Sequence, residues 1–593
     1  MRAISPELQL GRRQLARLKE YELIEDLQWN NSLNAWILHF TLTCDIPPHD
    51  YMPAKTNWYA VISSSYPFGK IKFYPDKNGG VIHTFQHQAY NKPSTKFPWR
   101  EGDICINTPL IKWGRELFKE EPMEPHARLK WHMERTISWI TAAAKNELTI
   151  TGEPFELPPL PGTESCMFIF NEDKSSFDQW VTAKVTEGTF TFKPIKNQGG
   201  LYAITGFAYG KEAIKYKWGN YINDFNGKES TGIFVMLKSV PVNAPWEIPA
   251  KWKDFFEAAG NQGIEIENIL HDLYVKHRKL GINWLAIGFP VTDVMGAGPT
   301  RMHWFNVRLE IPKTLKGFRD QKSMYQQIAK IIFAKDKTIN WQHAENWNKE
   351  QITSRGGLNK RLQQQRILFI GAGAVGSLLS EMLVRLGCSD TTIIDADIAE
   401  VGNFSRHDLT MESVGMHKAE SLAARLNSIF PFITARSINK PLQSALRNEK
   451  TFLYNYDLII DATGDDELIQ LVSDHLSDVH AFISVSTGIK ARRLFCYMRD
   501  EGQPECLHAD FNKLILPWLI KEKKENEGLQ LSREGVGCWH PVFPARLDDI
   551  TMLLGAAVKI IESQFCENKF TGLVVIEKKL DANDQFIGMD IIK

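Results

Sequence analysis

The sequence predicts a multidomain protein that combines α/β and α+β architecture, and three observations support this prediction. An apolar run at 367–370 (ILFI) enters a glycine-rich turn, which is followed by an amphipathic helix and a second apolar strand. This order is typical of a doubly wound α/β sheet. Residues 1–150 instead show short strands between two helical segments. A chain of 593 residues also exceeds the usual size of one domain.

The composition is that of an ordinary globular protein. The formal net charge is zero, and no apolar run approaches the roughly 18 residues of a spanning helix. The first twenty residues have no apolar core, so we expect no signal peptide. We therefore predict a cytoplasmic protein that binds neither a membrane nor nucleic acid directly. The eight cysteines form no CxxC pair, which predicts reduced thiols and no structural zinc.

Residues 1–150 are predicted to form an α+β domain. Residues 6–27 have the pattern of an amphipathic helix, and a second helix closes the domain at 126–145. Between them, three runs read as an antiparallel meander, at 35–44, 58–63 and 71–74. The segment 102–109 (GDICINTP) then follows an irregular polar stretch and carries Cys105.

Residues 151–163 (TGEPFELPPLPGT) are rich in proline and have no apolar period, which predicts a linker. Residues 164–340 follow as a second, mixed α+β domain. Its expected strands are 180–192, 202–208, 232–237, 282–291 and 303–311, and its expected helices are 264–277 and 323–334. This domain contains no motif that carries chemistry, so we interpret it as a linker or substrate-docking domain.

Residues 341–593 are predicted to form the doubly wound α/β domain. Its expected strands are 367–370, 392–394, 456–461, 482–486, 492–498 and 572–577, and a helix is expected at 418–429. The charged stretch 521–528 has the composition of an irregular, mobile segment.

The glycine-rich turn is GAGAVG, with Gly371, Gly373 and Gly376. Glycines there let the backbone turn tightly and approach a phosphate, and the helix that follows points its amide N–H groups outward. Asp395 ends the next strand, where a carboxylate can bind a ribose. Taken alone, this pattern also fits a NAD-dependent dehydrogenase.

Polar residues beyond Asp395 favour ATP over NAD. Asn403 and Arg406 follow it in the spacing D-x-D-x5-N-x2-R, and Lys418 begins the next predicted helix. Cations of this kind neutralise the charge that develops on phosphates, which hydride transfer does not require.

A second group of carboxylates follows the next buried strand. Asp461 ends that strand, and Asp465 comes four residues later. A carboxylate beside nucleotide phosphates can hold Mg²⁺. The sequence therefore predicts ATP and Mg²⁺ as cofactors.

Residues 366–465 resemble the adenylating domain of the ThiF/MoeB family and of ubiquitin-activating enzymes, through GAGAVG, DADIAEVGNFSRH, VGMHK and DATGD. The family has glycine where this chain has Ala374. The resemblance implies a Rossmann-like, ThiF-type domain that adenylates the C-terminal carboxylate of a small protein. It implies that Asp395 binds the ribose and that the phosphates meet Asn403, Arg406 and Lys418.

The same resemblance implies a metal ligand and a partner subunit. Mg²⁺ is expected on Asp465 or on Asp461. Both positions stay open because DATGD is one residue longer than the family pattern. Many members are homodimers in which an arginine upstream of the first strand reaches the partner's ATP. Arg355 is our candidate for that arginine, and we expect a homodimer.

An acyl-adenylate can pass to a thiol, and a reactive thiol needs a polar, accessible loop. Cys388 and Cys496 lie in apolar surroundings and are predicted to be structural. Cys538 lies in GVGCWHP, where glycines leave it approachable and His540 can lower its pKa. We choose Cys538 as the first thioester cysteine and keep Cys506 as an alternative.

The N-terminal helix, the strand meander, the motif YPFGKIKFYP, a cysteine after a long loop and a tryptophan eight residues later resemble a ubiquitin-conjugating domain. This resemblance implies that Cys105 carries the second thioester. No His-Pro-Asn motif precedes Cys105. Asn107 and His87 are the candidates for supporting the oxyanion in its place.

The whole chain resembles the fused conjugation enzymes of bacterial CBASS anti-phage operons. The resemblance implies that the C-terminal tail of a cGAS-like nucleotidyltransferase is adenylated, carried on Cys538 and then Cys105, and joined to a target lysine. Three alternatives stay open: a ThiF/MoeB-type enzyme that activates a sulfur carrier, a NAD-dependent dehydrogenase or nucleotide-sensing binding protein, and a non-catalytic scaffold.

Overall fold

A computed structural model describes residues 3–106, 121–162, 166–195, 199–312, 320–476, 481–499, 507–531, 543–567 and 572–592. The chain forms two compact units. The first consists mainly of Met1–Pro194, Gln198–Tyr216 and Lys228–Asn346, and the second of Lys217–Gly227 and Trp347–Lys593.

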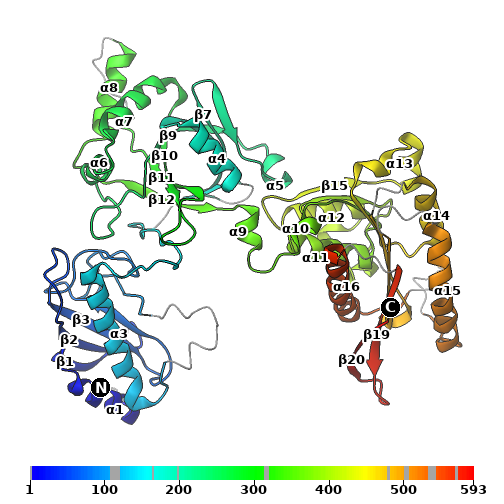
Figure 1. Ribbon diagram of the computed structural model, residues 1–593, viewed down its shortest axis with the longest axis horizontal. Helices are drawn as coiled ribbons and strands as arrows, with labels where there is room; N and C mark the ends of the chain where they lie inside the picture. Colours follow the sequence, from blue (N-terminus) through cyan, green and yellow to red (C-terminus); the bar gives the residue numbers. More distant parts are fainter. Residues whose placement is uncertain are drawn as a thin grey trace. The chain divides into compact units, whose positions relative to one another are not determined.

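The first unit begins with a four-stranded antiparallel sheet whose strands follow in sequence order (Figure 1). These strands are β1 (Tyr21–Asn30), β2 (Ala35–Thr43), β3 (Lys55–Ser63) and β4 (Ile71–Pro75). Helix α3 (Pro125–Lys145) packs on the sheet and buries Leu129, Met133 and Ile140 against the strand side chains. The three predicted strands and the closing helix are confirmed.

The predicted helix over residues 6–27 is wrong in its second half. Helix α1 spans only Pro6–Gln14, where the Ser5 side chain accepts the N–H of Leu8 and Pro6 occupies the first helical position. Residues from Tyr21 onward form β1 because they pair with β2, from Tyr21 opposite Leu42 to Asn30 opposite Ala35. Tertiary pairing thus overrides a helix-like local pattern.

The middle of the chain forms an eight-stranded mixed sheet in the order β5-β12-β11-β10-β9-β6-β7-β8. Because β5 pairs with both β12 and β7, the sheet closes on itself. The strands are β5 (Met167–Phe170), β6 (Glu187–Pro194), β7 (Leu201–Tyr209), β8 (Glu212–Lys215), β9 (Ser230–Met236), β10 (Trp284–Val291), β11 (Arg301–Arg308) and β12 (Asn340–Asn346). Helices α6 (Trp252–Gly260), α7 (Ile266–Lys276) and α8 (Gln321–Ile332) bury their apolar faces against β9, β10 and β11.

Two details of this sheet differ from the sequence prediction. The first half of the predicted strand at 180–192 is wrong, because Lys174–Ala183 forms helix α4, begun by a capping box between Asp173 and Ser176. Strand β12 belongs to this sheet, so the sheet extends beyond residue 340, where the sequence placed the third domain.

A buried carboxylate holds the closed sheet together. Glu172, only 1% exposed, follows β5 and accepts the indole N–H groups of Trp180 (2.9 Å) and Trp304 (3.0 Å). It also accepts the hydroxyls of Ser176 and Tyr216. These donors come from helix α4, strand β11 and the segment after β8, so one side chain connects the end of β5 to three other segments of this domain.

The second unit contains an eight-stranded sheet in the order β15-β14-β13-β16-β17-β18-β19-β20. The pairs from β15 to β17 are parallel and those from β17 to β20 antiparallel. The strands are β13 (Arg366–Ile370), β14 (Asp390–Ile394), β15 (Thr434–Ile438), β16 (Leu458–Asp461), β17 (Ala481–Thr487), β18 (Arg493–Arg499), β19 (Gly572–Leu580) and β20 (Phe586–Ile592). The predicted α/β fold of this part of the chain is confirmed.

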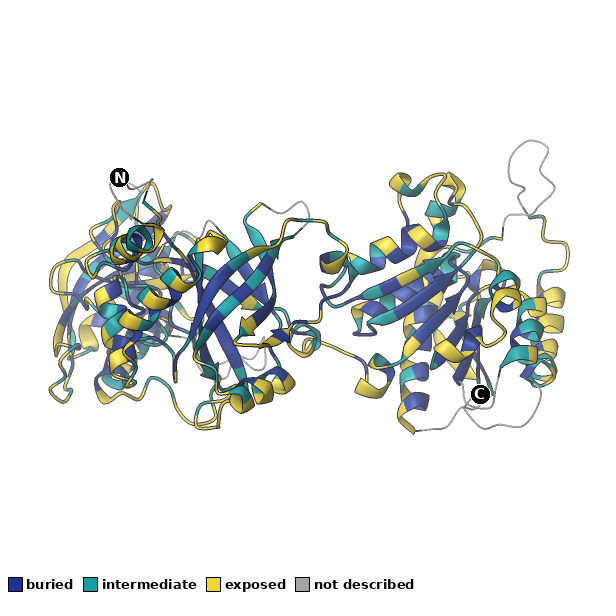
Figure 2. Cartoon of the chain, turned by 90° about the horizontal axis from the view of Figure 1, so that it is seen from above, coloured by how far each residue is buried: buried dark blue, intermediate teal, exposed yellow. Residues whose placement is uncertain are grey.

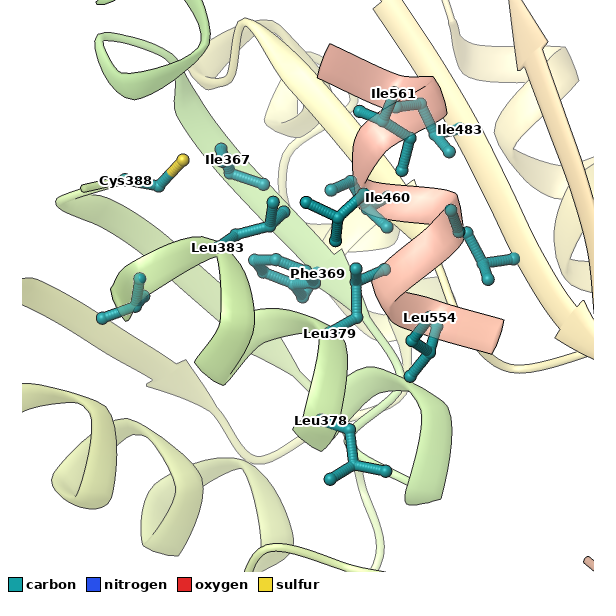
Figure 3. Packing of buried hydrophobic residues seen from close by; sticks show 14 of the residues in the cluster. Ile367, Phe369, Leu378, Leu379, Leu383, Cys388, Ile460, Ile483, Leu554 and Ile561 are labelled. Atoms are coloured by element: carbon teal, nitrogen blue, oxygen red, sulfur yellow. The ribbon is translucent and has the colours of Figure 1, made fainter. Parts of the chain in front are cut away.

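Helices cover both faces of the central strands, which lie as a buried layer in Figure 2. Ile367 and Phe369 point to a core shared with α11 (Ala374–Arg385) and α16 (Leu547–Glu567), where Phe369 packs beside Leu379 and Leu554 (Figure 3). Leu368 and Ile370 point to the other face, toward α14 (Asp466–His475) and α15 (Leu507–Glu525). Burial on both faces explains why this strand is apolar at every position after the first.

The prediction of an irregular segment at 521–528 is wrong for its first five residues, which form the last part of α15. Arg493 of β18 is fully buried and pairs with Glu522, Glu525 and Glu577. These ion pairs hold a strongly charged helix end against the sheet. Among the described residues, no helix is both long and apolar enough to cross a membrane.

We predict that Glu172→Gln lowers the free energy of unfolding of the closed sheet by about 2–4 kcal/mol, because the amide directs its own N–H groups at buried donors. Differential scanning calorimetry should show a lower midpoint for the transition of the first unit. Glu265→Gln is the control, since Glu265 is exposed and its side chain makes no cap hydrogen bond. Equal midpoints for the two variants would contradict the role of Glu172.

Candidate active site

The predicted site residues converge where strands β13, β14 and β16 end. β13 pairs in parallel with β14 on one side and with β16 on the other, so all three carboxyl ends meet at one edge. The connections leave this edge in opposite directions, which opens a crevice there. A cavity of about 230 Å³ occupies it. Its lining includes Gly373, Asn403, Arg406, His407, Lys418 and Thr463.

The three glycines of the turn have different structural roles. Gly371 has φ +93°, a left-handed conformation that favours glycine. A Cβ at Gly376 would lie 2.1 Å from the carbonyl oxygen of Gly371, so the start of α11 packs against the turn only without a side chain. At Gly373, no atom of the described residues other than its two chain neighbours lies within 4 Å of such a Cβ. Gly373 therefore leaves open the approach to the N-terminus of α11.

Asp395 lies beside this turn as predicted. Its Oδ2 accepts the N–H of Ala372 at 2.6 Å, and its Oδ1 accepts the N–H of Asp397 at 2.7 Å. The carboxylate thus ties the end of β14 to the glycine turn and stays only partly buried. Its remaining lone pairs are available to ribose hydroxyls.

His407 was not among the predicted site residues, although it directly follows Arg406. Its Nδ1 accepts the N–H of Leu409 at 3.1 Å, so the proton is on Nε2, which donates to the carbonyl of Ala372 at 2.6 Å. Burial lowers the pKa of His407, which keeps the ring neutral. His407 therefore binds the carbonyl of Ala372, while Asp395 binds the N–H of the same residue.

The predicted phosphate ligands lie together at the cavity. Lys418 is 12% exposed at its side chain, and its Nζ is 2.9 Å from Oδ2 of Asp397. Arg406 donates to the backbone carbonyl of Phe543. Asn403 accepts the N–H of Glu400 at 3.1 Å. Two cations, an amide and a helix N-terminus around one cavity form a set of donors suited to a polyphosphate.

Asp461 and Asp465, the two candidate Mg²⁺ ligands, have different surroundings. Asp461 is 1% exposed; its Oδ1 accepts the N–H and hydroxyl of Thr463, and its Oδ2 accepts the hydroxyl of Ser484 at 2.7 Å. Burial raises its pKa. Asp465 is exposed, and one oxygen caps α14 by accepting the N–H of Glu467. Asp461 therefore ties β16 to β17, and the geometry favours Asp465 as the metal ligand.

A metal at Asp465 would need ligands from a nucleotide. Within the described ranges, no three His, Cys, Asp or Glu side chains cluster in a way that could hold a metal ion. Mg²⁺ commonly binds one or two carboxylates together with substrate phosphates and water. One exposed carboxylate beside a phosphate cavity fits that pattern.

The cysteines separate into accessible and buried thiols. Cys105 is exposed between two buried neighbours, Ile104 and Ile106. Cys388 and Cys496 are buried, and burial raises the pKa of each to about 12, which confirms their prediction as structural.

The remaining predicted residues lie beside Cys105, upstream of β13 or outside the described ranges. Cys538, its alternative Cys506, and Asn107 lie outside the described residues. His87 lies next to Cys105, whose N–H donates to the His87 carbonyl at 2.7 Å. Arg355 is exposed after helix α9 (Lys349–Thr353), and its role across a dimer stays a prediction.

Comparison with known proteins identifies the family. Residues 344–534 match the ThiF family, and residues 146–347 match the family described as the Cap2 central linker domain. The ATP-dependent ubiquitin transferase-like protein Cap2 of Enterobacter hormaechei subsp. hoffmannii is 31% identical over 544 residues, which cover 89% of each chain. The chain belongs to the Cap2 family. This confirms the resemblance to fused conjugation enzymes that the sequence motifs indicated.

Other relatives match the adenylating part of this Cap2-family chain. The adenylyltransferase and sulfurtransferase UBA4 of Debaryomyces hansenii is 33% identical over 154 residues, 26% of this chain and 34% of that one. A crystal structure of E. coli MccB with ATP covers 39% of this chain and 64% of its own at 16% identity, but its TM-score of 0.29 is too low to add to the argument. Membership in the Cap2 and ThiF families makes the chain an ATP-using transferase of the ubiquitin-activating type, and not a dehydrogenase.

We predict that Gly373→Val abolishes nucleotide binding without loss of stability, because the new side chain fills the approach to α11 but meets no described residue. Gly376→Ala should instead lower the thermal unfolding midpoint, because its Cβ meets the Gly371 carbonyl. Isothermal titration with ATP and calorimetric unfolding separate the two effects. ATP affinity near that of the wild type in Gly373→Val would contradict the placement of the phosphates.

We predict that iodoacetamide at pH 8 alkylates Cys105 well before Cys44, Cys388 and Cys496. Burial raises the pKa of Cys44 to about 11, and the other two are higher still, so few thiolates form and none is accessible. Peptide mass spectrometry measures each rate, and the same reaction in urea is the control. Fast alkylation of Cys388 in the folded chain would show that the core opens there.

Proposed function

We propose that the chain uses ATP to activate the C-terminus of a partner protein, carries it as a thioester first on Cys538 and then on Cys105, and joins it to a lysine of a target. The main support is the cavity at the ends of β13, β14 and β16, where Asn403, Arg406 and Lys418 gather at a helix N-terminus. The exposure of Cys105 is the second support.

The residues at and near the cavity have separate roles in the adenylation step. ATP, when bound, supplies the adenylyl group and pyrophosphate as the leaving group. Asp395 orients the ribose, and the amide N–H groups at the start of α11 approach the phosphates. Lys418 and Arg406 take up phosphate charge, for which they exchange their contacts with Asp397 and the Phe543 carbonyl. Asp465 would hold Mg²⁺, which would neutralise part of the phosphate charge.

Two thiols then carry the acyl group. Cys538 attacks the acyl-adenylate and releases AMP, and Cys105 takes the acyl group by thioester exchange, which is close to balance in free energy. A lysine amine attacks the second thioester, forms an amide and releases the Cys105 thiol. Because the thioester exchange is close to balance, the ATP step supplies the free energy that drives the sequence. Following the CBASS resemblance, the activated protein is a cGAS-like nucleotidyltransferase, and its attachment primes anti-phage signalling in the cytoplasm.

A second copy of the chain completes the site in this proposal. Arg355 is exposed and lies upstream of β13, where an arginine can reach a partner's nucleotide. The chain therefore works as a homodimer.

A second candidate function is activation of a sulfur carrier, which the match of the ThiF region to UBA4 favours. That activity requires the adenylation cavity but has no use for Cys105. The activity of Cys105 variants therefore distinguishes the two functions.

We predict that Asp395→Asn and Arg406→Ala each slow ATP–pyrophosphate exchange by about 100-fold. Asp395 orients the ribose and Arg406 neutralises phosphate charge, and preorganised charged groups of this kind contribute several kcal/mol. The probe is a purified cGAS-like nucleotidyltransferase with its C-terminus intact, and the same protein without its last residues is the control. Absence of exchange in the wild type with the intact probe would refute the adenylation proposal.

We predict that ATP and this probe give a thiol-sensitive adduct on non-reducing gels. Cys538→Ala should remove every thioester adduct, whereas Cys105→Ala should leave the first adduct and abolish the amide product. An amide product that persists in Cys105→Ala would contradict the relay through Cys105, and absence of any amide product with the wild type would favour the sulfur-carrier function.

A further inference from the structure

The backbone of Cys105 is held by a short ladder that ends at His87. Gln88 and Ile104 form an isolated antiparallel bridge. Next to it, the N–H of Cys105 donates to the carbonyl of His87 at 2.7 Å. The position of the Cys105 backbone therefore depends on the conformation of His87.

His87 has an unusual conformation, with φ +56°. Few residues other than glycine adopt a left-handed φ, because the Cβ crowds the backbone there. A regular ladder would direct the N–H of His87 to the carbonyl of Cys105. Here that N–H donates instead to the carboxylate of Glu156, at 3.0 Å to Oε2 and 3.2 Å to Oε1.

Glu156 also contacts the side chain of His87. Its Oε2 lies 3.3 Å from Nδ1 of the imidazole. One carboxylate thus binds both the backbone and the ring of His87. Glu156 comes from the proline-rich segment at 151–163, outside the strands and helices of the N-terminal sheet.

We propose that Glu156 is a positioning residue for acyl transfer from Cys105 and acts by holding His87 in its left-handed conformation. This inference rests on the proposed function of Cys105 as a thioester carrier. In this proposal two parts of the chain form the transfer site. The proline-rich segment after α3 supplies Glu156, which fixes the ladder that carries Cys105.

The transfer step explains why this position matters. The amine nitrogen bonds to the thioester carbonyl carbon, the C–S bond breaks, its electron pair returns to Sγ of Cys105, and the proton of the amine passes to solvent. The line of attack depends on where the sulfur is held. A displacement of about 1 Å in such a site can slow a reaction roughly 100-fold.

The chain offers a matched control for this contact. His83 Nδ1 lies 3.2 Å from Oε2 of Glu247, and the N–H of Thr84 donates to Oε1 of Glu247 at 3.1 Å. This second glutamate binds a histidine ring and a backbone N–H in the same way. The carbonyl of His83 accepts from the Asn91 side chain and not from Cys105.

The test uses the full chain with its Cys105 charged by ATP and a cGAS-like nucleotidyltransferase. Charging is stopped with EDTA, free lysine is added, and loss of the Cys105 adduct is followed on non-reducing gels. We expect Glu156→Ala to charge normally and to discharge about 10–100 times more slowly, and Glu156→Gln to be intermediate. Glu247→Ala should discharge at the wild-type rate.

A second comparison tests whether Glu156 acts through His87. Glycine adopts a left-handed φ without support. The double variant Glu156→Ala/His87→Gly should therefore discharge less than about threefold more slowly than His87→Gly alone. Four results would each overturn the inference. The first two are normal discharge in Glu156→Ala and equal slowing in Glu247→Ala. The others are loss of charging in Glu156→Ala and an unchanged effect of Glu156→Ala in the His87→Gly background. Failure of the wild type to charge Cys105 would instead refute the proposed function.

Discussion

The adenylation site depends on the parallel pairing of β13 with two neighbours. Because β14 and β16 both run in the direction of β13, their carboxyl ends, and therefore Asp395 and Asp461, arrive at the same edge as the glycine turn. The helix that follows β13 begins at that edge, so its N-terminus faces the cavity. An antiparallel neighbour would have placed one of these carboxylates at the opposite end of the sheet. Strand direction thus brings together Gly371 and Asp461, which lie 90 positions apart in the sequence.

Burial on both faces is also the reason that this part of the fold could be predicted. Ile367 and Phe369 belong to one core and Leu368 and Ile370 to the other, so the strand is a continuous apolar run that no surface element would have. The turn glycines and the polar residues after each strand are local signals as well. The site was therefore predictable in outline from Gly371 to Lys418.

The failures concern elements whose form is set by distant partners. Residues 21–27 have a helical pattern, but they pair with β2, and residues 521–525 look irregular, but their acidic residues pair with the buried Arg493. The same holds within the site. Nothing local distinguishes Asp461, whose oxygens are occupied by Thr463 and Ser484, from the exposed Asp465. His407 was missed because its partner, the Ala372 carbonyl, lies 35 residues away in the sequence.

Partly or fully buried carboxylates recur at the points where loops must be held. Asp395 binds the N–H of Ala372 in the glycine turn, Asp461 ties together the ends of two strands, and Glu172 gathers four donors inside the closed sheet. Glu156 has the same kind of contact with His87. A carboxylate offers two oxygens and several lone pairs, so it can bind two donors from different segments, and charge-assisted hydrogen bonds are roughly twice as strong as neutral ones. Such contacts fix the geometry of loops that the apolar cores alone leave undetermined.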